Sequence, residues 1–335
     1  MSSPIEPLTH RLLPWLAPAF AQFDAARRRG QLGHAWLLSA PEDLGKINLA
    51  LALAHRLLGV ESEPPVLDAD AALTALPLRH AELDHHPDLH WLYPEEDKDT
   101  ISVEQVRAVI EAFALTAHRG VAKVVVIEPA EAMTIAAANA LLKTLEEPTP
   151  DTYLLLVSHR PGRLPATIRS RCQQLKLELP QPDALAAWLG VAPSAAGAAA
   201  QAVGPAPLAI ARAIRSDESS IFKALQDDLT QLSEDRADAS AVAQSWAKER
   251  PDAALAWLGR RLHAEIRLRL GGVSTEVTVP GVTTLHNALA GVPTRTLFDL
   301  HAKAEQLRNL LGSGLNVELA LHALLNGFLV NRGRS

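Results

Sequence analysis

The sequence predicts an α/β core, a parallel sheet covered by helices around a phosphate-type loop, followed by an all-helical C-terminal half. Short apolar runs alternate with amphipathic stretches through the first half, which is the pattern of strands joined by crossover helices. One run, Ala35–Leu38, leads into a loop that carries glycine and lysine and then into an apolar stretch of helical length. Beyond Pro180 the strand pattern ends and alanine-rich helical segments dominate.

Composition limits the classes of protein to which the chain can belong. Its 335 residues, 48% of them apolar, are enough for two or three domains with apolar cores. The formal net charge of −6 argues against a nucleic-acid-binding surface over the whole molecule and favours protein partners. Cys172 is the only cysteine, which excludes an internal disulfide and fits a reducing cytoplasm. No segment approaches about 18 consecutive apolar residues, so we expect a cytoplasmic protein that makes no membrane contact.

The first predicted strand and helix flank the loop. Ala35–Leu38 predicts a short buried strand, and Lys46–Leu58 predicts a helix directly after the loop. This order of strand, loop and helix is the one that a phosphate-binding site requires. The segment 59–94 carries proline, aspartate and histidine with little apolar character, which indicates an insertion or a long connection.

Further strand and helix signals follow in order. Ser102 and Gln105 have the spacing of a capping box and precede apolar residues at helical spacing, so a helix is predicted to begin there. Lys123–Ile127 and Thr152–Val157 are apolar runs typical of central parallel strands. Between them, residues 134–147 predict a helix that stops at a proline.

Changes in composition suggest two domain boundaries. We predict an α/β domain over residues 1–179, a small helical domain over 180–215 and a separate helical domain over 216–335. The clearest helices of the last domain are expected at 255–270, 297–311 and 316–330.

The loop from Ala40 to Ile47 matches the phosphate-loop pattern G-x-x-x-x-G-K-[ST] only in part. Gly45 and Lys46 stand at the second glycine and the lysine, whereas Ala40 replaces the first glycine and Ile47 replaces the hydroxyl residue. In a working loop the lysine reaches the β- and γ-phosphates and the hydroxyl oxygen binds Mg²⁺, which a hydrocarbon side chain cannot do. Weak nucleotide binding and a loop that only begins a helix both stay open.

Two longer motifs carry a resemblance to a known family. Residues 138–148 read ANALLKTLEEP, and Ser170–Cys172 follows after a predicted strand. Shorter agreements occur, in the same order, at Gly33–Ala35, His86–Asp88 and Leu319–Leu325. Over nearly its whole length the chain resembles the bacterial clamp-loader proteins of the AAA+ class. The resemblance implies an AAA+ core, a helical lid at 180–215 and a collar at 216–335 that joins subunits.

Departures from the family pattern indicate a member without ATPase activity of its own. By the resemblance, the ATPase subunits keep an intact phosphate loop, adjacent acidic residues after a strand and an arginine in the lid. Here the loop is degenerate, Glu128 and Glu131 are not adjacent, and Pro207 stands near the position of the lid arginine. The resemblance therefore implies no bound cofactor, with ATP and Mg²⁺ held by partner subunits.

By the same resemblance, Arg171 acts as an arginine finger in trans on the neighbouring ATPase subunit. The partners implied are the gamma/tau ATPase subunits and the delta subunit, together with the sliding clamp and primed DNA through the complex. Ser170 and Cys172 complete the motif, and Cys172 is expected to be a small buried residue rather than a nucleophile. For Arg171 the alternative is a surface salt bridge, and for Glu146 and Glu147 it is a solvated helix end.

Other interpretations remain open. A self-sufficient AAA+ ATPase would depend on Lys46. A DNA-binding surface could use Arg27–Arg29 with Arg163 and Arg169, although the acidic balance and the lack of interleaved aromatic residues disfavour it. The histidines near residues 80–90 could bind a metal, but their spacing does not match a structural zinc site, so no metal is expected; these are His80, His85, His86 and His90.

Overall fold

The computed structural model describes residues 11–75, 86–95, 98–113, 121–215, 218–270, 289, 291–312 and 314–330. It contains two compact units. The first comprises Met1–Gln181 and Ala206–Leu208, and the second comprises Pro182–Pro205 and Ala209–Ser335. A further division of the helical part into lid and collar domains stays a prediction.

The first unit is built on a sheet of five parallel strands in the order β2-β3-β4-β1-β5. The strands predicted at 35–38, 123–127 and 152–157 are confirmed as its three central strands. They are buried almost throughout, as the unbroken apolar runs require. The strands are β1 (Ala35–Ser39), β2 (Leu89–Leu92), β3 (Lys123–Ile127), β4 (Thr152–Ser158) and β5 (Gln173–Lys176).

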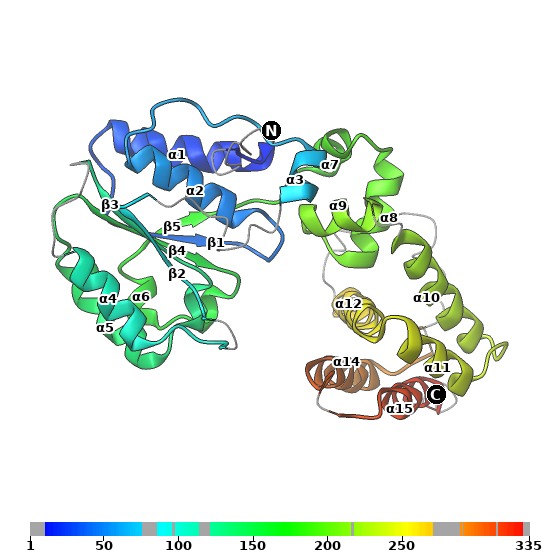
Figure 1. Cartoon of the computed structure of the whole chain (residues 1–335). Helices are drawn as coiled ribbons and strands as arrows, with labels where there is room; N and C mark the ends of the chain where they lie inside the picture. The colour runs from blue at the N-terminus through cyan, green and yellow to red at the C-terminus, as the bar shows by residue number, and fades with distance from the viewer. Residues whose placement is uncertain are drawn as a thin grey trace, which may run out of the picture. The chain divides into compact units, whose positions relative to one another are not determined.

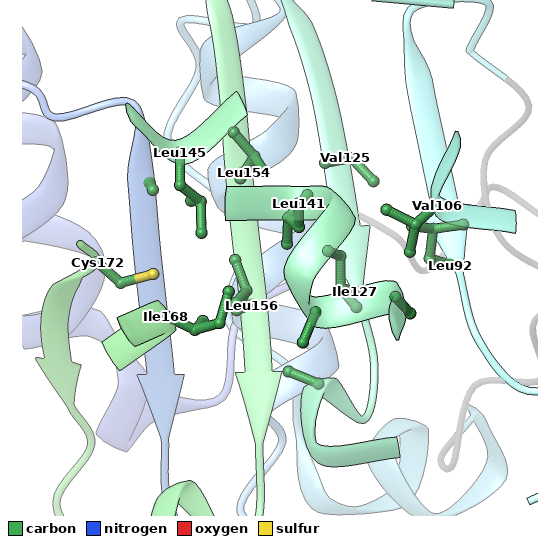
Figure 2. Packing of buried hydrophobic residues seen from close by; sticks show 14 of the residues in the cluster. Leu92, Val106, Val125, Ile127, Leu141, Leu145, Leu154, Leu156, Ile168 and Cys172 are labelled. Atoms are coloured by element: carbon green, nitrogen blue, oxygen red, sulfur yellow. The ribbon is translucent and has the colours of Figure 1, made fainter. Parts of the chain in front are cut away.

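Helices cover both faces of the sheet (Figure 1). On one face lie α1 (Ala17–Arg28) and α2 (Lys46–Leu57), and on the other lie α4 (Val103–Phe113), α5 (Ile135–Glu146) and α6 (Ala166–Arg169). Figure 2 shows the core under the second group, where apolar side chains of these helices meet those of the sheet. Short 3₁₀ turns lie at η2 (Pro14–Leu16), η4 (Ala130–Ala132) and η5 (Pro161–Arg163).

Local capping fixes where two of these helices begin. Ser102 N–H donates to Gln105 Oε1 at 2.9 Å, and Gln105 N–H donates to Ser102 Oγ at 3.2 Å, so the predicted capping box is confirmed. Thr134 Oγ1 accepts from the N–H of Ala137 at 3.2 Å and caps α5. The helix predicted at 134–147 is therefore confirmed to within one residue at each end.

The segment 59–94, predicted as an insertion or a long connection, also contains regular structure. This segment contains the helix α3 (Ala69–Ala75) and the edge strand β2. The strand β5 was also not expected from the sequence. Both β2 and β5 are edge strands of four residues with partly exposed side chains, so neither has the continuous apolar run by which central strands are recognised.

The second unit is helical. The helices predicted at 255–270, 297–311 and 316–330 are confirmed as α12, α14 and α15, with small shifts at their ends. Trp257, Leu258 and Leu262 of α12 are buried, as are Leu300 of α14 and Leu325 of α15. The remaining helices are α7 (Pro182–Leu189), α8 (Pro193–Val203), α9 (Pro207–Arg215), α10 (Glu218–Ser233) and α11 (Ala239–Glu249), followed by α12 (Pro251–Arg269), α14 (Thr294–Asn309) and α15 (Val317–Val330).

None of the helices among the described residues is both long enough and apolar enough to span a membrane.

Candidate functional site

The degenerate phosphate loop lies at the carboxyl end of β1, where it leads into α2. Gly45 begins the helix in the left-handed conformation, with φ 87°. A Cβ at this position would lie 2.1 Å from Leu13 Cδ1 and 3.4 Å from Leu16 Cδ1. Both leucines are fully buried. The loop is therefore packed against an apolar segment near the N-terminus. Glycine is required at position 45 because the backbone has a positive φ and because a Cβ would collide with Leu13.

Two hydrogen bonds join this loop to other segments of the first unit. The indole N–H of Trp15 donates to the carbonyl of Leu44 at 2.9 Å. The N–H of Leu208 donates to the carbonyl of Asp43 at 3.0 Å. Leu208 follows Pro207, the residue near which the family resemblance expects a nucleotide-sensing arginine. In this chain that short stretch binds the loop backbone instead.

Lys46 points at its own loop. Its side chain is 3% exposed, and its Nζ donates to the carbonyl of Pro41 at 2.5 Å. Burial lowers the pKa of Lys46 from 10.5 to about 8, although the charges of Glu128, Glu42 and Glu131 act in the opposite direction. In a working loop this ammonium would reach phosphate oxygens. Here a backbone carbonyl accepts its hydrogen bond.

Two carboxylates that follow β3 contact residues that follow β4. Glu131 Oε1 accepts hydrogen bonds from the N–H groups of His159 and Arg160, each at 2.9 Å. Burial alone would raise the pKa of Glu131, but hydrogen bonds from Ser158 and from nearby backbone N–H groups bring it below its usual value. The carboxylate of Glu128 lies 3.4 Å from His159 Nε2.

These residues do not fit a bound Mg²⁺–nucleotide. The hydroxyl that would bind the metal is replaced by Ile47, and Glu131 Oε1 already accepts hydrogen bonds from two backbone N–H groups. The lysine donates to a loop carbonyl. Within the described ranges, no group of three histidine, cysteine or acidic side chains is arranged to hold a metal ion.

Arg171 lies between α6 and β5, on a short segment held by buried neighbours. Ile168 and Cys172 are buried in the core on either side, whereas Arg169, Ser170 and Arg171 are exposed. Burial raises the pKa of the Cys172 thiol to about 12. The expected burial of Cys172 is confirmed, and a thiol with this pKa is a poor nucleophile because nucleophilic chemistry needs the thiolate.

The guanidinium of Arg171 contacts Glu146, Thr167 and, at 3.5 Å from Nη1, the hydroxyl oxygen of Ser170. Its Nη2 lies 2.5 Å from Glu146 Oε1, and its Nη1 donates to the carbonyl of Thr167 at 3.0 Å. The Ser170 hydroxyl donates to the same carbonyl at 3.2 Å. Glu146 is thus more than a solvated helix end, since it forms the surface salt bridge that was the simpler alternative for Arg171.

The structure does not bring Arg171 to the loop of its own chain. Strands β1 and β5 are parallel, and Trp36 lies opposite Gln173 while Ser39 lies opposite Lys176. Arg171 precedes β5, whereas Lys46 follows β1. The strand between them accounts for roughly 10 Å along the sheet. Arg171 therefore lies at the amino ends of these two strands, whereas Lys46 lies beyond the carboxyl ends.

The other candidates from the sequence, the basic run at Arg27–Arg29 and the histidines near residues 80–90, have contacts within the protein or lie outside the described residues. Arg27 forms ion pairs with Asp24 and Glu61, and Arg28 does so with Asp24, so part of the basic run is engaged with acidic side chains. His86 Nδ1 accepts from the N–H of Asp88, and the ring of His90 packs edge-on against Phe113. His80 and His85 lie outside the described residues.

Sequence reasoning missed one residue of the site, His159, and one contact, between Glu146 and Arg171. His159 follows the buried strand β4 directly, and a polar residue at the carboxyl end of a central strand is a signal that could have found it. Glu146 was recognised as part of a motif, but its pairing with Arg171 joins residues that are 25 apart in the chain. No local pattern predicts such a pairing.

Comparisons with known proteins now identify the family. Residues 16–181 match the family described as DNA polymerase III, delta subunit, and residues 217–329 match the one described as DNA polymerase III, delta subunit, C terminal. The chain is 34% identical over 324 residues to DNA polymerase III subunit delta′ of Escherichia coli K12, covering 94% of each protein. The chain belongs to the DNA polymerase III delta-prime family. The family resemblance seen in the sequence motifs is confirmed, and the chain is a delta-prime clamp-loader subunit.

Other matches are more partial. Delta′ of Pseudomonas aeruginosa PAO1 is 44% identical over 178 residues, which is 53% of this chain and 52% of that protein. Among solved structures, the Thermotoga maritima RuvB Holliday junction branch migration motor aligns over 92% of each chain at 19% identity, with a TM-score of 0.41.

Proposed function

We propose that this delta-prime subunit is a non-hydrolysing scaffold that supplies Arg171 in trans to the active site of a neighbouring ATPase subunit. The observation that carries the proposal is the separation of the two sites. In the loop that would bind nucleotide, Lys46 donates to a loop carbonyl and Gly45 lies against Leu13 and Leu16, while Arg171 is exposed at the opposite end of the strands. Arg171 is therefore better placed to contact a nucleotide bound by another chain than one bound at the loop of its own chain.

The chemistry of phosphoryl transfer supports this role. Charge spreads over the oxygens of the transferred phosphoryl group, and a planar, permanently charged guanidinium matches that distribution. Arginine fingers supply roughly 10³ to 10⁵ in rate in such enzymes. Because Arg171 already has a fixed position on a segment anchored by Ile168 and Cys172, the entropy lost on forming the active site is small.

The proposal includes the partners. The gamma/tau ATPase subunits would bind ATP and Mg²⁺, and the delta subunit would complete the complex. The sliding clamp and primed DNA would be engaged by the complex as a whole, in the cytoplasm during replication. This chain would need no cofactor of its own, since its loop offers neither a metal-binding hydroxyl nor a free lysine.

ATP turnover tests the proposal. We would measure it for the chain alone and for the complex with partner subunits, clamp and primed DNA, using wild type, Arg171→Ala and Arg169→Ala. Arg169 is exposed on the same segment and is the matched control. We expect no turnover by the chain alone, a loss of at least about 10²-fold with Arg171→Ala in the complex, and little change with Arg169→Ala.

Two results would contradict this function. Full activity of the Arg171→Ala complex would remove the in-trans role. Turnover by the chain alone that disappears with Lys46→Ala would instead make the chain a self-sufficient ATPase of the clamp-loader type.

A further inference from the structure

We infer that Glu146 is a positioning residue for Arg171: with the carbonyl of Thr167, it holds the guanidinium in the orientation that is presented to a neighbouring subunit. The inference rests on the proposed in-trans function. In that reaction, the carboxyl-terminal residue of α5 would fix the direction of the Arg171 side chain, which lies between α6 and β5.

The hydrogen bonds leave enough of the guanidinium free for a phosphate. Arginine has five N–H donors in a rigid plane. Glu146 takes one at Nη2, and the carbonyl of Thr167 takes one at Nη1. Nη1 also lies 3.5 Å from Ser170 Oγ, so the Nε–H and the second N–H of Nη2 remain for oxygens of a bound phosphate. Because both terminal nitrogens are held, the plane of the guanidinium is defined as well as its position.

Both ends of this contact are fixed to the same core. Leu145 precedes Glu146 and Cys172 follows Arg171, and both side chains are buried in the cluster that also contains Ile168 (Figure 2). In addition, His34 Nε2 is hydrogen-bonded to the carbonyl of Leu145 at 2.8 Å, which ties the end of α5 to the start of β1. The carboxylate is therefore a fixed support rather than a second mobile side chain.

The ion pair between Arg171 and Glu146 contributes little to the stability of the fold. The Arg171 side chain is 35% exposed and the Glu146 side chain is 51% exposed. Ion pairs this exposed to water contribute almost nothing to the free energy of unfolding. What the pair does provide is restriction of a long side chain that otherwise samples many rotamers. Immobilising such a side chain in advance is worth about a 2- to 10-fold gain in a step that requires its bound orientation.

Steady-state turnover by the reconstituted complex tests the inference, with the variants Glu146→Ala, Glu146→Gln and Glu147→Ala. Glu147 is the adjacent exposed carboxylate and serves as the control. We expect Glu146→Ala to lower kcat about 2- to 10-fold at unchanged KM for ATP. Glu146→Gln should fall in between, because its amide oxygen still accepts a hydrogen bond, and Glu147→Ala should behave as wild type.

A second readout does not depend on activity. NMR relaxation of the Arg171 Nε–H group in the free chain should show greater mobility in Glu146→Ala than in wild type, and no change in Glu147→Ala. In the double variant Glu146→Ala/Arg171→Ala, turnover should equal that of Arg171→Ala alone, since a positioning residue has no effect once its arginine is absent.

The outcomes separate the inference from the proposed function. If Arg171→Ala abolishes stimulation while Glu146→Ala retains full kcat, the in-trans function stands and the positioning role is wrong. A rise in kcat with Glu146→Ala would also overturn it, because the ion pair would then be a restraint. If Arg171→Ala has no effect on turnover, the proposed function itself fails.

Discussion

The ammonium of Lys46 and the carbonyl of Pro41 are joined by a hydrogen bond of 2.5 Å within a single loop. The contact gives this lysine an acceptor within a loop that has Ile47 where the phosphate-loop pattern has a metal-binding hydroxyl. The carbonyl accepts a hydrogen bond from the ammonium, and nearby acidic side chains partly offset the cost of burying the charge. The residue therefore has a structural role here.

This relationship predicts a pH-dependent stability. The pKa of Lys46 falls from 10.5 to about 8 on folding, so between these pH values the unfolded chain binds the proton and the folded chain does not. Raising the pH through this window then favours the folded state, by up to roughly 3 kcal/mol for this group. Urea denaturation of wild type and Lys46→Met from pH 7 to pH 10 measures it. The difference in unfolding free energy, wild type minus variant, should rise with pH.

A difference that stays constant across that range would show that Lys46 is solvated and keeps an ordinary pKa. Other lysines and tyrosines titrate in the same window, but they are common to both proteins and cancel in the comparison.

The packing of the loop predicts unequal effects of two glycine substitutions. Gly45 and Gly30 both have positive φ, at 87° and 67°, so alanine is strained at either position. A Cβ at position 30 meets no atom within 4 Å, whereas at position 45 it meets Leu13 Cδ1. We expect Gly30→Ala to lower stability by about 1 kcal/mol and Gly45→Ala by about 1–3 kcal/mol more. Denaturation midpoints at unchanged m-value measure this, and equal losses would mean that Leu13 does not cover the loop.

The central part of the fold was predictable because its signals are local. Runs such as Lys123–Ile127 are apolar over a full strand length and so indicate burial on both faces. The capping box at Ser102 fixes a helix start with two hydrogen bonds that depend only on residues three apart. The edge strands β2 and β5 were missed because sheet edges are only partly covered, and their sequences carry the mixed polarity of a loop.

The candidate site was predictable in its parts but not in its contacts. Motif spacing identified Lys46 and Arg171, and the replacement of a hydroxyl residue by Ile47 indicated a loop that lacks a ligand for Mg²⁺. Spacing could not show that Lys46 donates to Pro41, or that Arg171 pairs with Glu146, because these contacts depend on how the loop and the sheet place the side chains in space. A motif therefore identifies the residues of a site, whereas their contacts follow from the fold.

A buried arginine near the C-terminal end of α2 predicts a large loss of stability. Arg56 is 1% exposed, its Nη1 lies 3.2 Å from Asp24 Oδ2 and its Nη2 donates to the carbonyl of Ser62 at 3.1 Å. Arg56→Met leaves both acceptors without this partner, and we expect a loss of about 3 kcal/mol. Arg28 also pairs with Asp24 but its side chain is 62% exposed, so Arg28→Ala should cost less than about 1 kcal/mol. Similar losses for the two variants in chemical denaturation would contradict this distinction.

Cys172 provides a direct probe of the segment that carries Arg171. Burial raises the pKa of its thiol to about 12, and only the thiolate reacts with disulfide reagents such as Ellman's reagent. At pH 8 we expect the native chain to react at least about 10²-fold more slowly than the urea-unfolded chain. Since this is the only cysteine, all labelling reports this position.

The native labelling rate then measures how often the segment opens. If Ile168 and Cys172 anchor Arg171 as the structure indicates, opening requires disruption of the core, and the rate should follow global stability when urea is added below the unfolding transition. Glu146→Ala should leave this rate unchanged, because the ion pair lies outside the core and orients the guanidinium only. Rapid stoichiometric labelling of the native chain would mean that the segment is mobile, and an arginine on a mobile segment would have to be ordered by the neighbouring subunit instead.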